Sequence, residues 1–175
     1  MQPHRQRPPA PVGRDPGLER DAVAFHEALA DLVRVYQFRD RMSISWHGIS
    51  VTQCYALEAL VDRGALTMNE LAGLLWLDKS TASRVADGLE AAGLVRRTPH
   101  PTDGRSILLE PTRTGRGLHQ RIVTDLIAGE KALLEDFAPE VRQAATRLIA
   151  RLARVATARA RGQADCPPAH PDSSF

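Results

Sequence analysis

Two segments near opposite ends of the chain carry apolar residues at alternating spacings of four and three positions. The first stripe consists of Leu18, Ala22, Phe25, Leu29, Leu32 and Tyr36, and the second of Val141, Ala145, Leu148, Leu152 and Val155. This heptad-like spacing places each stripe on one face of a helix. The pattern predicts a long helix within 17–48 and another that starts at Pro139, because proline suits the first helical position.

A third amphipathic stretch, 114–137, precedes the last helix. Its apolar positions are Leu118, Ile122, Leu126, Leu133 and Phe137, and Gly129 is a predicted weak point. An apolar helix stripe needs a partner surface. The stripes can pack within one monomer, but a second copy is favoured because two of them lie at opposite chain ends. We therefore expect 17–48 and 113–161 to be the dimerisation helices of a homodimer.

Shorter elements occupy the middle of the chain, 49–112. A helix is expected over 50–63, and Gly64 follows it at the C′ position that glycine favours. Thr67 and Glu70 have the spacing of a capping box at the start of the next helix. This segment contains enough apolar positions to form a small core of its own.

A second capped helix and a hairpin follow. Asp78 is a good N-cap, and Gly93 ends the helix that Asp78 begins. The runs 94–97 and 106–109 have strand composition and flank a loop rich in turn residues. Helix, turn, helix and hairpin in this order predict a winged helix-turn-helix, which reads duplex DNA. The expected fold class is mainly α with a small β-wing, flanked by N- and C-terminal dimerisation helices.

The helix after Asp78 has one apolar and one polar side. Ala82, Val85, Ala86 and Leu89 recur at helical spacing and form its buried face. The other side and the N-terminal end carry the candidate DNA-binding residues Lys79, Ser80, Thr81, Ser83 and Arg84. Short hydroxyls reach phosphates or base edges at close range, and arginine pairs with guanine O6 and N7. The alternative interpretation is an ordinary solvated helix face.

The hairpin supplies the remaining candidate DNA-binding residues. Arg97 ends the first strand, and the loop 98–105 holds two prolines, a histidine, Asp103 and Arg105. A cation at this place can enter the narrow minor groove beside the recognition helix. Asp103 and Arg105 point to the same side of an extended chain, so the carboxylate can orient the guanidinium.

Composition adds little to this picture. The 175 residues carry a formal net charge of only +2, so DNA binding must come from local placement of charge. Cys54 and Cys166 do not suggest a disulfide framework, which favours a reducing cytoplasm. No apolar run suits a membrane span or a signal peptide. We expect a cytoplasmic protein that binds no membrane.

Both ends of the chain, 1–16 and 162–175, have the composition of disordered tails. The first is basic, and its arginines, Arg5, Arg7 and Arg14, offer the alternative of an arm that touches phosphates. The six histidines show no metal-ligand spacing, and no nucleophile elbow, P-loop or dinucleotide fingerprint is present. We expect no enzyme activity, no metal and no cofactor.

The central segment resembles the MarR family of winged-helix transcription regulators over about 51–118. The matching residues are Leu71-Ala72, DKSTASR at 78–84, Leu89-Glu90, GLVRR at 93–97, DGR at 103–105 and TRTG at 112–115. The resemblance implies a dimer, major-groove contacts from Ser80, Thr81, Ser83 and Arg84, and a minor-groove contact from Arg105. Two positions depart from the family pattern. Gly104 replaces a frequent arginine, and Pro111 replaces a frequent leucine and is expected to bend or shorten the return strand.

The resemblance also implies control by a small anionic or phenolic ligand bound between the dimer helices and the winged lobe. The candidate ligand-binding residues near that junction are Tyr36, Arg39, Trp46, His47 and Tyr55. Aromatic rings can line an apolar pocket, and arginine or histidine can hold a carboxylate. The alternative is that Trp46 and Tyr55 are core residues and His47 is an ordinary polar residue.

The sequence thus predicts a homodimeric transcription regulator that binds an inverted-repeat operator, most simply a ligand-released repressor. Two other functions remain open. The winged helix can be a protein-interaction module, or the protein can be a DNA-binding redox sensor acting through Cys54. A lone cysteine on an apolar helix face is more often a small buried side chain.

Overall fold

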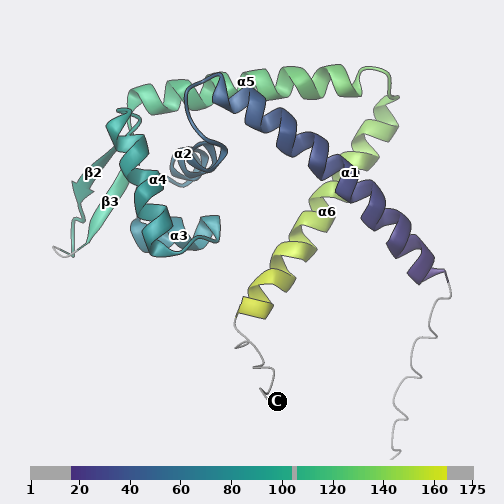
Figure 1. The fold of residues 1–175 in the computed structure, drawn as a ribbon, viewed down its shortest axis with the longest axis horizontal. Coiled ribbons are helices and arrows are strands. Elements are labelled where there is room, and N and C mark those ends of the chain that lie inside the picture. The colour runs from purple at the N-terminus through teal and green to yellow at the C-terminus, as the bar shows by residue number, and fades with distance from the viewer. Residues whose placement is uncertain (1–16, 104–105, 165–175) are drawn as a thin grey trace, which may run out of the picture. The chain divides into compact units, whose positions relative to one another are not determined.

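The computed structural model describes residues 17–103 and 106–164 (Figure 1). Within them, the elements follow the order α1 (Leu18–Ser45), α2 (Val51–Arg63), β1 (Leu66–Thr67), α3 (Met68–Leu75), α4 (Lys79–Ala91), β2 (Val95–Pro99), β3 (Ile107–Pro111), α5 (Arg113–Leu134) and α6 (Pro139–Ala164). The predicted fold class is confirmed: the chain is mainly helical with one small antiparallel sheet. It forms two compact units, which divide within α5 after residue 126.

Local hydrogen bonds define the helix starts of the winged lobe. The Ser50 hydroxyl accepts from the Gln53 backbone N–H, and the Gln53 side chain accepts from the Ser50 N–H in return. Thr67 and Glu70 form the predicted capping box at α3. Such reciprocal bonds satisfy N–H groups that a helix leaves without partners at its first turn.

The turn between α3 and α4 is tight and lacks glycine. Trp76 ends α3 in the left-handed region at φ 56°, and its backbone N–H donates to the Ala72 carbonyl. The next N–H, that of Leu77, donates to the same carbonyl at 3.0 Å. The left-handed residue reverses the chain within two positions, so that Asp78 begins the recognition helix directly.

The sheet has the strand order β1-β3-β2, and both pairs are antiparallel. Strand β1 was not predicted, because two residues are too few to show alternation. The expectation that Pro111 shortens the return strand is wrong: β3 runs to Pro111, which lies opposite Val95. Proline is tolerated there because it is the last residue of the strand, and the following N–H, that of Thr112, donates to the Leu94 carbonyl at 2.9 Å.

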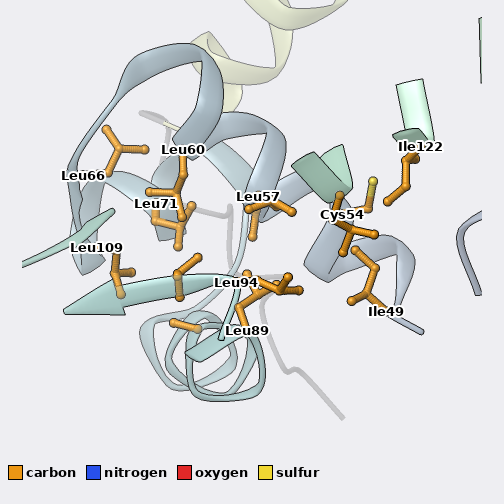
Figure 2. Packing of buried hydrophobic residues seen from close by; sticks show 14 of the residues in the cluster. Ile49, Cys54, Leu57, Leu60, Leu66, Leu71, Leu89, Leu94, Leu109 and Ile122 are labelled. Atoms are coloured by element: carbon orange, nitrogen blue, oxygen red, sulfur yellow. The ribbon is translucent and has the colours of Figure 1, made fainter. Parts of the chain in front are cut away.

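The core lies in the winged lobe (Figure 2). Its largest fully buried side chains are Ile44, Leu57, Leu60, Leu71, Leu89, Leu109 and Ile122. They come from helices α1 to α5 and from strand β3. Ile44 therefore attaches the end of α1 to the lobe, and Ile122 attaches the first half of α5. The recognition helix α4 contributes Ala82, Ala86 and Leu89 as predicted, whereas Val85, the fourth predicted member of the buried face, is only half-buried against this core.

The long helices expose their apolar stripes. In α1, Phe25, Leu29 and Leu32 are each more than two-fifths exposed. In α6, considered by itself, the stripe of Val141, Leu148, Leu152 and Val155 is exposed as well. Helix α5 passes through Gly129 without a break, and α6 continues to Ala164, so the prediction of a disordered tail from residue 162 is wrong for 162–164. The predicted tail 1–16 and residues 165–175 lie outside the described residues.

None of the helices in the described ranges is both long enough and apolar enough to cross a lipid bilayer.

Candidate nucleic-acid interface

The N-terminus of α4 is organised around the Asp78 carboxylate. This group accepts hydrogen bonds from the Thr81 backbone N–H at 2.9 Å, the Thr81 hydroxyl at 2.7 Å and the Ser80 hydroxyl at 2.8 Å. These bonds, those from Thr81 first, hold the pKa of the Asp78 carboxyl well below its usual range. Asp78 therefore caps the helix and also fixes the rotamers of two predicted DNA-binding residues.

The network extends along the exposed face of the recognition helix. One Arg84 Nη donates to the Thr81 hydroxyl oxygen at 3.1 Å. The Ser80 hydrogen is donated to Asp78, so its hydroxyl oxygen is available as an acceptor. An acceptor at this position suits the amino group of adenine or cytosine in the major groove. Fixed rotamers reduce the entropy cost of binding.

Lys79, Ser83 and Arg97 line one hollow of about 320 Å³ between the start of α3, α4 and the sheet. Lys79 is exposed and Ser83 is half-buried. The structure thus brings together the predicted residues of the recognition helix and the first wing strand.

Arg97 binds two carboxylates of the recognition helix. One Nη lies 2.5 Å from Asp87 Oδ1, and the other donates to Glu90 Oε2. The hydrogen bond to Asp87, followed by the charges of both acids, raises the pKa of the guanidinium above its ordinary value. The other arginine of the strand, Arg96, donates to Glu110 at 3.0 and 2.6 Å across the hairpin.

The wing loop has its own polar contacts. His100 Nδ1 accepts from the backbone N–H groups of Thr102 and Asp103, at 3.3 and 3.2 Å. The Ser106 hydroxyl donates to the Asp103 carboxylate at 2.5 Å. Arg105, the predicted minor-groove cation and the expected partner of Asp103, lies outside the described residues.

Sequence reasoning missed the acidic residues that organise this surface. Asp87 and Glu90 lie three residues apart on α4, and Glu110 lies opposite Arg96 on the neighbouring strand. The i, i+3 spacing of Asp87 and Glu90, followed by a strand with two arginines, was the available signal. Because neighbouring side chains on a strand point to opposite faces of the sheet, only one of the two arginines can face the recognition helix.

The predicted ligand residues fall into two groups. Tyr36 and Tyr55 line an open hollow of about 930 Å³ between α1 and α2. The Arg39 guanidinium lies 4.0 Å from the centroid of the Tyr36 ring, and it also donates to the Asp40 carboxylate at 3.0 Å. Tyr36 and Tyr55 therefore share one hollow, and Arg39 adjoins it through the Tyr36 ring.

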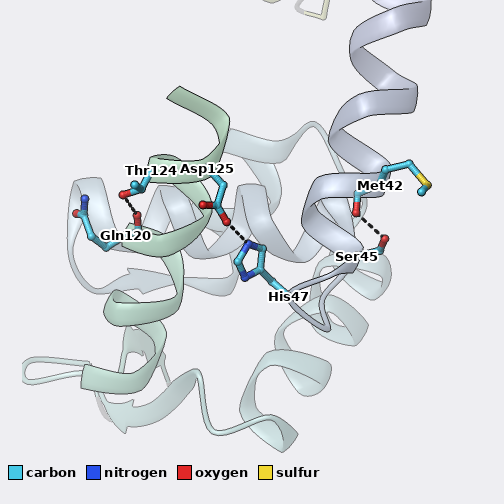
Figure 3. Close-up of polar contacts among 6 residues, drawn as sticks. All are labelled: Met42, Ser45, His47, Gln120, Thr124 and Asp125. Carbon is cyan, nitrogen blue, oxygen red and sulfur yellow. Dashed lines mark hydrogen bonds and ion pairs between the residues drawn. The ribbon is translucent and has the colours of Figure 1, made fainter. Parts of the chain in front are cut away.

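Trp46 and His47 belong to the turn that follows α1. Figure 3 shows His47 pointing to α5, where its Nε2 lies 3.0 Å from the Asp125 carboxylate. Trp46 is 83% exposed and Tyr55 is 47% exposed. The alternative that Trp46 and Tyr55 are core residues is therefore wrong. His47 already has a carboxylate partner within the chain.

Cys54 is buried on α2, with 5% of its surface exposed. Burial, and then the charges of Glu58 and Asp40, raise the pKa of its thiol to about 11. At neutral pH only about one thiol in ten thousand is then ionised, and the thiolate is the form that peroxide oxidises. These properties argue against a redox sensor.

We expect that peroxide does not change DNA binding by oxidising Cys54. In a Cys166→Ser background, which leaves Cys54 as the sole cysteine, hydrogen peroxide at stoichiometric level should not alter DNA affinity in gel shifts. The matched Cys54→Ser variant should behave identically. Peroxide release that disappears with Cys54→Ser would restore the redox interpretation.

A capped recognition helix with an exposed polar face, followed by a β-hairpin, defines a winged helix-turn-helix protein of the DNA-binding class. A family model described as "MarR family" matches residues 47–106. The multiple antibiotic resistance protein MarR of Salmonella typhimurium is 32% identical over 116 residues, which cover 58% of this chain and 81% of that protein. The transcriptional regulator PecS of Dickeya dadantii is 32% identical over 114 residues, which cover 63% of this chain and 67% of PecS.

A solved structure supports the fold. A MarR family protein from Bacillus stearothermophilus superposes with a TM-score of 0.73 at 24% identity, covering 79% of this chain and 97% of that one. The chain belongs to the MarR family of transcription regulators, and it is a DNA-binding regulator of transcription. PecS and a further relative from Mycobacterium leprae are named as HTH-type transcriptional regulators.

Proposed function

We propose that a homodimer of this chain represses transcription by binding an inverted-repeat operator, and that a small aromatic or phenolic ligand releases it. The observation that carries the proposal is the exposed α4 face, where Asp78 fixes the hydroxyls of Ser80 and Thr81 and Thr81 in turn binds Arg84. An ordered row of donors and acceptors on a helix of this motif suits the major groove.

The contacts divide by groove. Ser80, Thr81, Ser83 and Arg84 read base edges in the major groove, and Lys79 at the start of the helix binds a phosphate. Arg105 enters the minor groove, Asp103 orients it, and Arg97 supports the wing from its first strand. The 17–48 and 113–161 helices join the two copies, which is supported by their exposed apolar stripes.

A symmetric dimer presents two recognition helices related by a two-fold axis. Half-sites should therefore lie about 10–10.5 base pairs apart, one turn of the duplex. Footprinting on bound fragments selected from the source genome tests this expectation, and transcription in vitro from the same fragments tests repression. An asymmetric footprint contradicts the dimer model. Binding to no fragment at all would favour a protein-interaction module.

Arg84 should contribute strongly to base recognition. Arg84→Ala is expected to cost roughly 1–3 kcal/mol on the best operator and to relax its base preference. Arg121→Ala, which removes an exposed arginine from α5, is the matched control and should keep wild-type affinity. Titrations against the operator and its single-base variants provide the measurement. Unchanged base preference in Arg84→Ala would contradict direct readout even if affinity fell.

The hollow between α1 and α2 is the proposed ligand site. Its volume of about 930 Å³ lies within the usual range for small-molecule sites, and Tyr36 and Tyr55 provide rings and hydroxyls. Arg39, which lies over the Tyr36 ring, provides a positive charge for a carboxylate. A ligand changes operator affinity only if it binds the DNA-free form more tightly than the DNA-bound form.

We expect millimolar salicylate to lower operator affinity and to change Trp46 fluorescence with the same midpoint. A Trp76→Phe background leaves Trp46 as the only tryptophan. Tyr55→Phe removes one hydroxyl and should weaken the response by about two- to tenfold, the value of one hydrogen bond. DNA binding without ligand should stay unchanged. If a panel of phenols and aromatic carboxylates alters neither signal, the ligand proposal is wrong.

A further inference from the structure

Arg97 forms a bridge between the wing and the recognition helix, and the bridge involves two carboxylates. Its two terminal nitrogens bind different residues: Asp87 at 2.5 Å and Glu90. The two acids stand one helical turn apart on α4, while Arg97 lies in the middle of β2, opposite Leu109. We refer to Arg97, Asp87 and Glu90 as the wing clamp.

The clamp joins the two elements that must contact DNA together. A recognition helix in the major groove and a hairpin in the adjacent minor groove need a fixed mutual orientation. The guanidinium is planar, so bonds from its two ends to two acceptors fix direction as well as distance. A lysine in its place has a single nitrogen and cannot reproduce this geometry.

Charge also distinguishes Arg97 from a cation that binds phosphate. One guanidinium faces two carboxylates, so the clamp carries one excess negative charge. The Arg97 side chain is 30% exposed, less than either acid. A cation that is already paired with two acids releases few additional counterions when DNA arrives.

We propose that Arg97 is a positioning residue for operator recognition: through Asp87 and Glu90 it holds the wing against the recognition helix, and it contacts no phosphate. The proposal rests on the operator binding proposed above. It goes beyond that proposal because it assigns a role in DNA recognition to two acidic residues that DNA itself repels.

The first test is the salt dependence of operator affinity. Each phosphate contact contributes about −0.9 to the slope of log K against log salt concentration. Lys79→Ala is the reference variant and should make the slope less steep by about one. Arg97→Lys and Arg97→Gln should lower affinity about tenfold or more, the value of a charge-assisted hydrogen bond. Both should lose the preference for A·T-rich sequence beside each half-site that the Arg105 contact with the narrow minor groove provides, and their slope should fall by no more than that of Arg105→Ala. In an Arg105→Ala background, Arg97→Gln should leave the slope unchanged.

The second test separates positioning from simple neutralisation of the acids. The double variant Asp87→Asn with Glu90→Gln leaves Arg97 in place and removes its ionic partners. It should lose the A·T preference in the same way as Arg97→Gln. The triple variant with Asp87→Asn, Glu90→Gln and Arg97→Gln removes every charge of the clamp. It should recover neither the operator affinity nor the A·T preference. Recovery of wild-type affinity in the triple variant would mean that Arg97 acts only by masking negative charge.

Three further results would overturn the proposal. A shallower salt slope when Arg97→Gln is added to Arg105→Ala means that Arg97 binds phosphate, and wild-type affinity in both Arg97 variants means that the clamp has no role. If the wild-type protein binds no operator, the proposed function itself fails. That outcome is distinct from failure of the clamp proposal, which is judged only from the variants. Circular dichroism of each variant monitors folding, and the acid double variant, altered only at exposed or half-exposed positions, provides a test independent of Arg97.

Discussion

Leu148→Asp should convert the protein from a dimer to a monomer and abolish tight operator binding. Leu148 is 56% exposed on α6 and belongs to the stripe that includes Leu152 and Val155. If a second copy covers this stripe, the aspartate is buried without a partner, which costs several kcal/mol, about 2–7 for a polar group and more for a charge. Two copies contribute a charge each, so the dimer has to accommodate both.

The loss of DNA binding follows from the loss of linkage between two recognition helices. A monomer engages one half-site, whereas a dimer engages the second as an intramolecular event, so affinity should fall by about 100-fold or more. Light scattering at micromolar concentration measures the mass, and gel shifts measure the affinity.

The control for this substitution is Gln143→Asp. Gln143 is exposed on α6 and lies about opposite Leu148 around the helix, so this variant adds the same charge outside the stripe and should remain a dimer. A wild-type monomer that binds a palindrome tightly, or a Leu148→Asp variant that stays dimeric, would contradict this assembly model.

Gly115→Ala should strongly destabilise the winged lobe. A Cβ atom at Gly115 would lie 2.1 Å from the Leu94 carbonyl oxygen and 3.2 Å from Leu57 Cδ1. The backbones of Gly115 and Leu94 are both held by hydrogen bonds, so neither can easily move away. The Gly115 N–H donates to the Thr112 hydroxyl oxygen at 3.0 Å, and that hydroxyl donates to the Gly93 carbonyl at 2.8 Å. We expect the free energy of unfolding to fall by about 3 kcal/mol, the upper end for overpacking in a core.

Gly117→Ala provides a matched control in the same turn of α5. The nearest atom to a Cβ there is the tip of the flexible Arg121 side chain, at 3.7 Å. Alanine is favoured over glycine in a helix by about 1 kcal/mol, so this variant should be as stable as wild type or more stable. Urea unfolding measures both variants. Equal stability of the two would show that the close approach of α5 to Leu94 does not hold in solution.

The recognition helix could be predicted almost completely because its signals are local. Asp78 caps the helix by accepting from the backbone N–H of Thr81, three residues ahead, and Ala82, Ala86 and Leu89 repeat at the period of that helix. Gly93 adopts the positive φ, 69°, that its position after the helix requires. Each of these features connects residues that are only a few positions apart, so the printed sequence contains all of the participants.

The hairpin was predicted less accurately. Both strands start one residue later and end two residues later than expected, because pairing with a neighbour, rather than composition, decides where a strand begins and ends. Strand β1 pairs with β3 across about forty positions of sequence, and its two residues have no pattern of their own. The structure places Lys79, Ser80, Thr81, Ser83 and Arg84 on α4, and Arg97 and Asp103 in the hairpin, as expected. The carboxylates that bind Arg97 were not predicted.

The sequence by itself determined the order of the helices, their caps, the polar face of α4 and the apolar stripes of α1 and α6. These follow from periodicity and from hydrogen bonds that close within one helical turn. Only the tertiary structure decided that Arg97 binds Asp87 and Glu90, that His47 binds Asp125, and that Gly115 touches the Leu94 carbonyl. Such contacts depend on how whole elements pack, and packing is set by the shape of the shared core rather than by any short stretch of sequence.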